Sequence, residues 1–169
     1  DFAQADKARL LLSDSFAAQK KYDDAGAILQ QLVAANREGE EATLRLAWTL
    51  LKDGKKEPAA RIFREFATKY PQHASAPLAL YNAGITLYDL KQYPAAVETF
   101  LKLKETAPQS REAQDLRFWL ALSYFELGKH AEAIALLDPL VAGKDLEAKL
   151  RPGALYTLAE ARGATKDFA

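Results

Sequence analysis

The sequence predicts an all-α fold, a solenoid of helix-turn-helix repeats. Four alanines follow one another at intervals of 34, 37 and 37 residues, at Ala25, Ala59, Ala96 and Ala133. A large apolar residue follows each alanine by four positions, and another follows it by seven. A fixed period of this length is typical of stacked helical hairpins, in which each unit buries its apolar face against its neighbours. The 169 residues correspond to about four and a half such units.

The composition agrees with a helical chain that buries a core. Hydrophobic residues make up 49% of the sequence, and helix formers dominate it without any run of alternating β-branched residues. The 23 basic and 23 acidic residues give a net charge of zero, which argues against a nucleic-acid partner. No stretch is apolar enough to span a membrane. The absence of cysteine excludes disulfides and thiolate metal sites, but it fits the cytoplasm and the periplasm equally well.

The first unit is predicted from apolar spacing alone. Helical patterns cover residues 5–19 and 23–35. Lys20 stands between them, at the position where a glycine is expected to end the first helix. The interval of 34 residues after this unit, against 37 later, predicts a shorter link between the first two hairpins.

The second unit has clear start and stop signals. Its first helix is expected over residues 40–52, and Asp53-Gly54 ends it because glycine readily adopts the left-handed conformation. Its second helix starts near Pro58, since proline suits the first turn of a helix. It ends before Tyr70-Pro71, because the residue before a proline disfavours helix.

The third and fourth units follow the same plan. In the third, Ser75 is expected to cap a helix that ends near residue 90, and a second helix runs from Tyr93 to about residue 106. In the fourth, Ser110 and Ala113 are placed like an incomplete capping box. The first helix of this unit is expected to end at a turn at Gly128, and the second helix covers about residues 131–141.

A ninth helix is expected up to about residue 162. Arg151-Pro152-Gly153 marks either a kink or the start of this helix. Residues 166–169 match the turn at residues 91–94, and a solenoid that stops between two helices leaves an apolar face uncapped, so the sequence predicts a fragment of a longer repeat protein. The predicted domain is one solenoid with repeats at about 6–39, 40–76, 77–113 and 114–151 and a partial repeat at 152–169.

Residues 79–108 resemble a repeat of the tetratricopeptide family almost in full. The residues that carry this resemblance are Ala83, Gly84, Leu87, Tyr93, Ala96, Phe100, Leu103 and Pro108. Residues 115–137 repeat the pattern, with His130 in place of the turn aromatic. The 37-residue spacing and the segment Phe118-Trp119-Leu120-Ala121 are similar to a bacterial subgroup that includes Tol–Pal accessory proteins and outer-membrane assembly lipoproteins. This resemblance leaves an envelope location and a cytoplasmic one open.

The resemblance implies a right-handed α-α superhelix whose concave side is lined by the first helix of each hairpin. In the family register, the concave residues are apolar and aromatic in the middle of the chain. They are Leu44, Trp48, Leu51, Tyr81, Ile85, Tyr88, Phe118, Leu122 and Phe125. Acidic residues, namely Asp89, Asp115 and Glu126, follow one rim, and the first unit offers a smaller and more polar surface.

This concave groove has two interpretations. Tyrosine and tryptophan are the usual anchors of protein interfaces, so the groove is predicted to hold a peptide or helix of a partner protein. The same aromatic residues would also suit simple packing between adjacent repeats. The clamp with which some family members bind carboxylate tails needs lysine and asparagine, and those positions hold Leu10, Asp14, Leu44, Trp48, Tyr81 and Ile85, so we do not expect that activity.

No constellation of catalytic or metal-binding residues is evident. The two histidines, His73 and His130, have no second histidine at ligand spacing, and no phosphate-binding glycine loop or nucleophile elbow exists. We therefore expect neither an enzyme, nor a cofactor, nor a metal site in this chain. Two other functions remain as alternatives to groove binding. One is a structural component of a bacterial envelope complex that associates through its repeat ends. The other is an RNA-binding helical repeat, which the neutral charge opposes.

Overall fold

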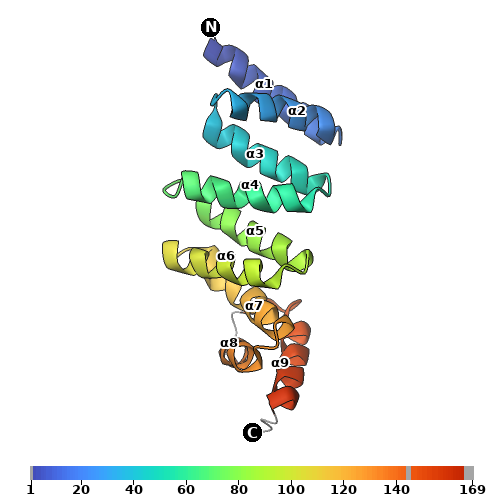
Figure 1. Cartoon of the computed structure of the whole chain (residues 1–169), viewed down its shortest axis with the longest axis vertical. Helices are drawn as coiled ribbons and strands as arrows, with labels where there is room; N and C mark the ends of the chain where they lie inside the picture. Colours follow the sequence, from blue (N-terminus) through green and yellow to red (C-terminus); the bar gives the residue numbers. More distant parts are fainter. Residues whose placement is uncertain (1, 144–145, 166–169) are drawn as a thin grey trace.

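The computed structural model describes residues 2–143 and 146–165, and these residues form nine α-helices and no strand. The helices stack in chain order as antiparallel hairpins along one long axis, with the two ends of the chain at opposite ends of the stack (Figure 1). Their bounds are α1 Phe2–Ala18, α2 Tyr22–Ala34, α3 Gly39–Lys52, α4 Lys56–Lys69, α5 Ala76–Asp89, α6 Tyr93–Thr106, α7 Arg111–Glu126, α8 His130–Ala142 and α9 Arg151–Thr165. The predicted all-α solenoid of helical hairpins is confirmed.

The turn inside each hairpin has one residue with a positive φ. These residues are Lys20 (φ 61°), Gly54 (φ 78°), Lys91 (φ 58°) and Gly128 (φ 71°). They lie one period apart, so the backbone repeats the left-handed turn even where the sequence supplies lysine instead of glycine. Glycine meets this requirement without the steric cost that a Cβ atom adds.

The links between hairpins account for the change in period. The first link covers residues 35–38 and the second covers residues 70–75, so the link between the first two hairpins is the shorter of these two, as predicted. The third link, residues 107–110, is also short, because α7 is two residues longer than α5 and takes up the rest of the 37-residue period. The link from α8 to α9, residues 143–150, is the longest.

The helix starts follow the local sequence in most cases. The hydroxyl of Ser110 accepts a hydrogen bond of 3.1 Å from the backbone N–H of Ala113, as the incomplete capping box predicts. Pro152 lies in the first turn of α9, so the segment Arg151-Pro152-Gly153 marks the start of this helix and not a kink. Ser75 takes the N-cap position of α5 as predicted, but its side chain makes no capping bond. Its backbone N–H donates to Nδ1 of His73 at 3.0 Å.

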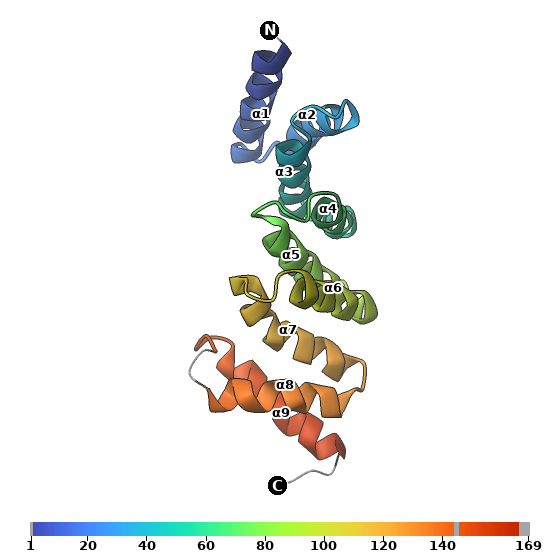
Figure 2. The same ribbon diagram turned by 90° about the vertical axis from the view of Figure 1, so that its left-hand side faces the viewer.

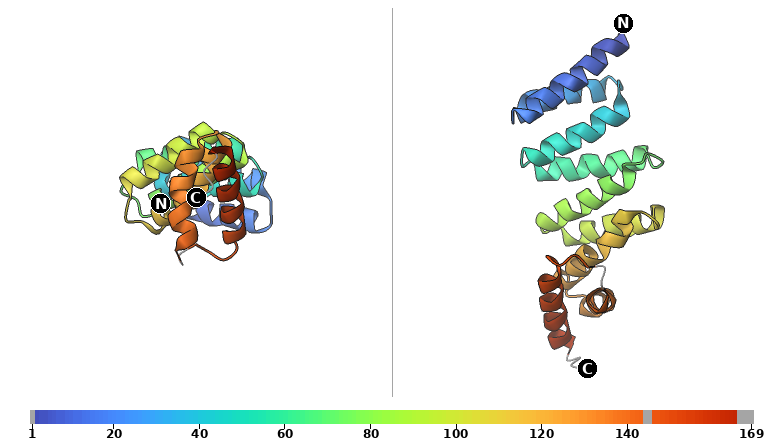
Figure 3. Two further views of the ribbon diagram at one scale, coloured as in Figure 1. Left: turned by 90° about the horizontal axis from the view of Figure 1, so that it is seen from below. Right: turned by 180° about the vertical axis from the view of Figure 1, so that it is seen from behind.

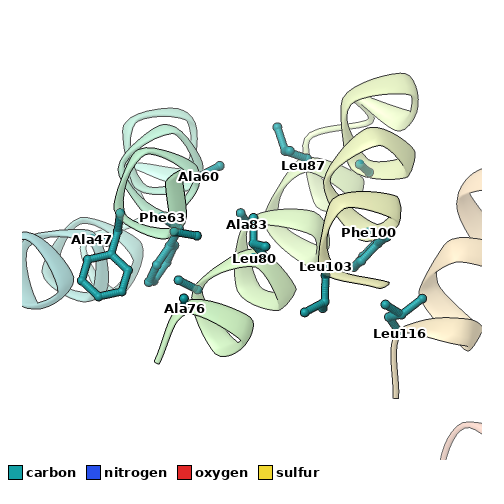
Figure 4. Close-up of a cluster of buried hydrophobic side chains, with 14 of the residues drawn as sticks. Ala47, Ala60, Phe63, Ala76, Leu80, Ala83, Leu87, Phe100, Leu103 and Leu116 are labelled. Atoms are coloured by element: carbon teal, nitrogen blue, oxygen red, sulfur yellow. The ribbon is translucent and has the colours of Figure 1, made fainter. Parts of the chain in front are cut away.

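The core runs through the middle of the stack between first and second helices. Its largest cluster joins α3 to α7 (Figure 4). It includes Phe63, Phe66 and Phe100, which are fully buried. Smaller clusters join α1 to α4 and α7 to α9. Because each cluster shares helices with the next, the hairpins form one continuous core, which is how a solenoid gains its stability.

Polar contacts link successive hairpins near the surface. Several of them join residues 31 to 34 positions apart: Lys55 Nζ lies 2.7 Å from Asp23, Lys56 Nζ lies 3.1 Å from Asp89, and Arg64 lies 3.2 Å from Glu98. Arg45 on α3 likewise pairs with Asp14 on α1. These pairs are exposed and therefore add little stability each, but they repeat with the period of the fold.

The last two helices, α8 and α9, differ in their arrangement from the earlier helices. A quarter turn of the view shows α8 and α9 crossing beneath α7 (Figure 2), and the view from behind shows α9 beside α8 (Figure 3). None of the helices in the described part of the chain is both long and apolar enough to cross a membrane. Residues 166–169, on which the comparison with the turn at residues 91–94 depends, lie outside the described residues.

Candidate functional site: the surface of the first helices

The residues that the family register places on the concave side come from α3, α5 and α7. Eight of the nine are half-buried, namely Leu44, Trp48, Leu51, Tyr81, Ile85, Tyr88, Leu122 and Phe125. Most of them pack with part of the side chain against the central core and leave the rest in solvent. We refer to these eight residues as the apolar stripe. It continues across three successive hairpins, because first helices recur once in every period.

Aromatic members of the stripe pack both within a hairpin and between hairpins. Within the second hairpin, the ring of Trp48 on α3 meets the buried ring of Phe63 on α4 edge-on, with centroids 5.0 Å apart. Tyr88 on α5 lies 5.5 Å from Trp119 on α7. Such pairs contribute to stability beyond the area that they bury. The aromatic residues therefore support the packing between hairpins, and their exposed parts remain for contact with another molecule.

Phe118 does not belong to the exposed surface. Only 5% of it is accessible, and it lies in the C-terminal core cluster with Leu140 and Leu146. A Cβ atom added at Gly153, on α9, would be 3.6 Å from the Phe118 ring. The link from α8 to α9 and the start of α9 therefore cover this residue. A family register derived from regular hairpins gives no sign of this, because the longer link is a local feature of this chain.

A cavity of about 230 Å³ lies next to Phe118, between α5, α7 and the link before α9. Its buried lining is apolar and comes from Phe118, Leu140 and Leu146. Its exposed lining is charged and comes from Arg111, Asp115 and Glu147. Tyr81, Arg117 and Leu150 complete the wall. We call this space the Phe118 cavity. It opens to solvent on its charged side.

Charge around the stripe is arranged in pairs. Two of the three acidic residues predicted for the rim are paired: Asp89 lies 3.1 Å from Lys56, and Asp115 lies 3.5 Å from Arg111. Burial, together with the nearby carboxylate of Glu126, raises the pKa of Tyr88 to about 12. The Tyr88 hydroxyl therefore stays protonated to a higher pH than an ordinary tyrosine does. Burial also raises the pKa of Tyr81.

A second recess lies on the other side of the stack, between α4 and α6. It has a volume of about 670 Å³, and most of its lining residues are charged: Glu57, Arg61, Arg64, Glu65, Lys69, Glu98 and Lys102. Arg64 and Glu98 pair across it at 3.2 Å. Lys102 donates to the hydroxyl of Thr68 at 2.7 Å. The sequence did not predict this recess. Charged residues on the exposed faces of second helices follow the same sequence pattern whether or not a recess lies between the helices.

The two histidines have packing roles. His73 meets Phe66 edge-on at 5.1 Å, and His130 meets Phe125 at 5.4 Å, as expected for a residue in the turn-aromatic position. Within residues 2–143 and 146–165, no group of three or more histidine, aspartate or glutamate side chains is placed to hold a metal ion.

Comparison with protein families gives three matches, all described as tetratricopeptide repeat. They cover residues 16–76, 78–110 and 109–145. A comparison with functionally curated proteins gave no match.

Solved structures share the fold at low sequence identity. One is the MamA protein, with a TM-score of 0.73 at 17% identity over 96% of this chain and 83% of that chain. Another is a Podosopora anserina protein described as a kinesin light chain with nearly identical TPR-like repeats. It gives a TM-score of 0.65 at 18% identity over 96% of this chain and 87% of that chain. A thermophilic TPR protein from Thermus thermophilus gives 0.53 at 22% identity over 96% and 84%.

Proposed function

Because the chain belongs to the tetratricopeptide repeat family, whose fold generally serves as a scaffold for protein–protein interaction, we propose that it is a non-catalytic scaffold that holds a peptide or helix of a partner protein against the apolar stripe. The observation that carries this proposal is the stripe itself. Apolar and aromatic side chains that are partly exposed recur on α3, α5 and α7, the first helices of three successive hairpins. Apolar surface of this kind usually marks an interaction site.

The burial of the stripe sets the affinity that we expect. Full burial of a large apolar side chain contributes about 1.5–3 kcal/mol. The stripe residues are already partly buried, so a partner would gain roughly 0.5–1 kcal/mol from each, or about 4–8 kcal/mol from all eight. Association costs of several kcal/mol oppose this gain. The stripe alone therefore supports weak binding, and tighter binding needs an additional anchor.

Selection from a displayed library of random peptides tests this proposal. Peptides enriched on the parent chain are then measured against two variants that place a charge in the stripe, Ile85→Glu on α5 and Leu122→Glu on α7. Leu101→Glu is the matched control, because Leu101 is 43% exposed on the second helix α6. Circular dichroism checks that every variant stays helical.

The proposal predicts that both stripe variants lose the selected peptides and that the control retains them. Enrichment of peptides that bind parent and stripe variants alike would place recognition elsewhere on the surface. A library that yields no specific binder would contradict the proposal directly.

One observation favours a second function, assembly through the repeat ends. On α9 the residues Leu155 and Tyr156 are 48% and 66% exposed. Ala159 on the same helix is exposed, whereas Ala47 and Ala121, at the equivalent position of earlier hairpins, are fully buried. The resemblance of residues 118–121 to envelope repeat proteins extends this proposal to a bacterial envelope complex. Sedimentation velocity over a range of concentrations tests it, and a strict monomer would count against self-assembly through α9.

A further inference from the structure

We propose that the Phe118 cavity is an anchor site that receives one large apolar side chain of a partner peptide, while Arg111 at its edge binds a carboxylate next to that side chain. This inference rests on the proposed function and names the chemistry of the partner. The cavity borders the apolar stripe, since Tyr81 of the stripe forms part of its wall.

The size of the cavity fits a single side chain. Its volume of about 230 Å³ is below the range of roughly 300–1,000 Å³ that is usual for pockets of drug-sized ligands. A dry apolar cavity of about 150 Å³ already accepts benzene in another protein. The buried lining of Phe118, Leu140 and Leu146 offers no charged group, so the occupant of the inner part must be apolar.

Charged side chains stand at the edge of the cavity, where they can contact a polar group beside that side chain. Among the described residues at or next to the opening, Arg111, Arg117 and Lys149 are cationic, and Asp115 and Glu147 are anionic. Lys149 lies 2.8 Å from Glu147 and satisfies that carboxylate. This ion pair, with a smaller contribution from the charge of Arg111, lowers the pKa of Glu147.

Arg111 is the cation best placed to accept a further partner. Its side chain is 84% exposed, and it lies 3.5 Å from Asp115, one helical turn away. A guanidinium group offers five donors in a fork that matches a carboxylate, so it can bind a second one without losing the first. An acidic residue next to the anchor of the peptide would meet this group at the edge of the cavity.

Three acetylated dipeptide amides test the inference in a titration followed by two-dimensional NMR of the whole chain. Acetyl-Glu-Phe-amide has both features. Acetyl-Gln-Phe-amide lacks the carboxylate, and acetyl-Glu-Ala-amide lacks the anchor. We expect the first to bind in the millimolar range and to shift the amides of residues 115–118 and 146–150. The second should bind about two- to fivefold more weakly, and the third at least about tenfold more weakly.

Two variants test the two parts of the site separately, namely the apolar cavity and the guanidinium group of Arg111. Leu150→Trp, which fills the cavity from its wall, should abolish the saturable shifts. Arg111→Gln should bind the Glu-Phe and Gln-Phe peptides equally, because the carboxylate has lost its partner. Arg61→Gln is the matched control. Arg61 is also exposed on a helix and also pairs with an acid one turn later, Glu65 at 3.6 Å, but it lies far from the cavity, on α4.

The outcomes separate this inference from the proposed function. If acetyl-Glu-Phe-amide gives no saturable shift at these amides, or if a folded Leu150→Trp variant binds it as well as the parent does, the cavity is not an anchor site. If Leu150→Trp fails to fold, the Arg111→Gln comparison decides alone, since an exposed arginine can be replaced without disturbing the core. Library peptides that lose binding to Ile85→Glu but bind Leu150→Trp normally would retain the proposed function and refute the anchor.

Discussion

Gly84 gives a sharp test of how the hairpins pack. It lies on α5 against the ring of Phe100 on α6, and Figure 4 shows Phe100 in the core cluster. A Cβ atom at position 84 would be 2.3 Å from Cε1 of Phe100, 2.6 Å from Cζ and 2.7 Å from Cδ1. Phe100 is fully buried, so its ring cannot move into solvent. We therefore expect Gly84→Ala to push the two helices of this hairpin apart.

Two opposing effects set the size of the change in the free energy of unfolding. Overpacking a core costs about 1–3 kcal/mol, and replacement of a glycine inside a helix by alanine gains about 1 kcal/mol. The added carbon needs about 1 Å more room to reach an ordinary contact, which places the cost at the upper end of this range. The expected result is a stability lower by about 2 kcal/mol, measured by urea unfolding with circular dichroism.

Two further variants make this prediction specific. Gly26 on α2 has nothing within 4 Å of its added Cβ, so Gly26→Ala should stabilise the chain by about 1 kcal/mol. The double variant Gly84→Ala/Phe100→Leu imitates the pair Ala121 and Leu137, which occupies the equivalent positions of the fourth hairpin. It should recover part of the loss caused by Gly84→Ala. If Gly84→Ala stabilises the chain as much as Gly26→Ala does, the close approach of α5 and α6 is wrong.

Three other predictions concern single groups. Lys91→Gly should raise the stability by about 0.5–1 kcal/mol in the same urea assay, because position 91 has a positive φ. Ser110→Ala should lower the stability by about 1 kcal/mol through loss of the helix cap, whereas Ser75→Ala, which removes no capping bond, should leave it unchanged. The Tyr88 phenol should ionise near pH 12 when followed by tyrosinate absorbance, and Glu126→Gln should lower that pKa. Because the pKa of Tyr88 is raised above its ordinary value of 10.0, its contribution to stability is present below pH 10 and is lost as the pH rises through 12.

Most of the fold was predictable because its determinants are local and repeated. The column of small residues from Ala47 to Ala121 and the breaks at Gly54 and Gly128 recur in register, so each hairpin supports the assignment of the others. The absent capping bond at Ser75 shows the limit of this reasoning. The backbone N–H of Ser75 is satisfied by a histidine two residues earlier, and that choice depends on how the link packs on Phe66.

The candidate site was predictable only in part. The family register assigns Trp48, Tyr81 and Tyr88 to first helices, and the structure leaves each of them half-exposed. It gives no indication that Phe118 is covered by the link before α9, because this link is longer than the links between the earlier hairpins. The same link forms part of the wall of the Phe118 cavity. The sequence therefore did not predict this cavity either. The residues that bind a partner remain a prediction.

An NMR shift map of the parent chain with its tightest library-selected peptide tests the central proposal most directly. The account predicts that the largest shifts fall on α3, α5 and α7, around Trp48, Ile85 and Leu122, and that they end at the Phe118 cavity. Shifts confined to the second helices α4 and α6, beside the recess that Arg64 and Glu98 span, would contradict it.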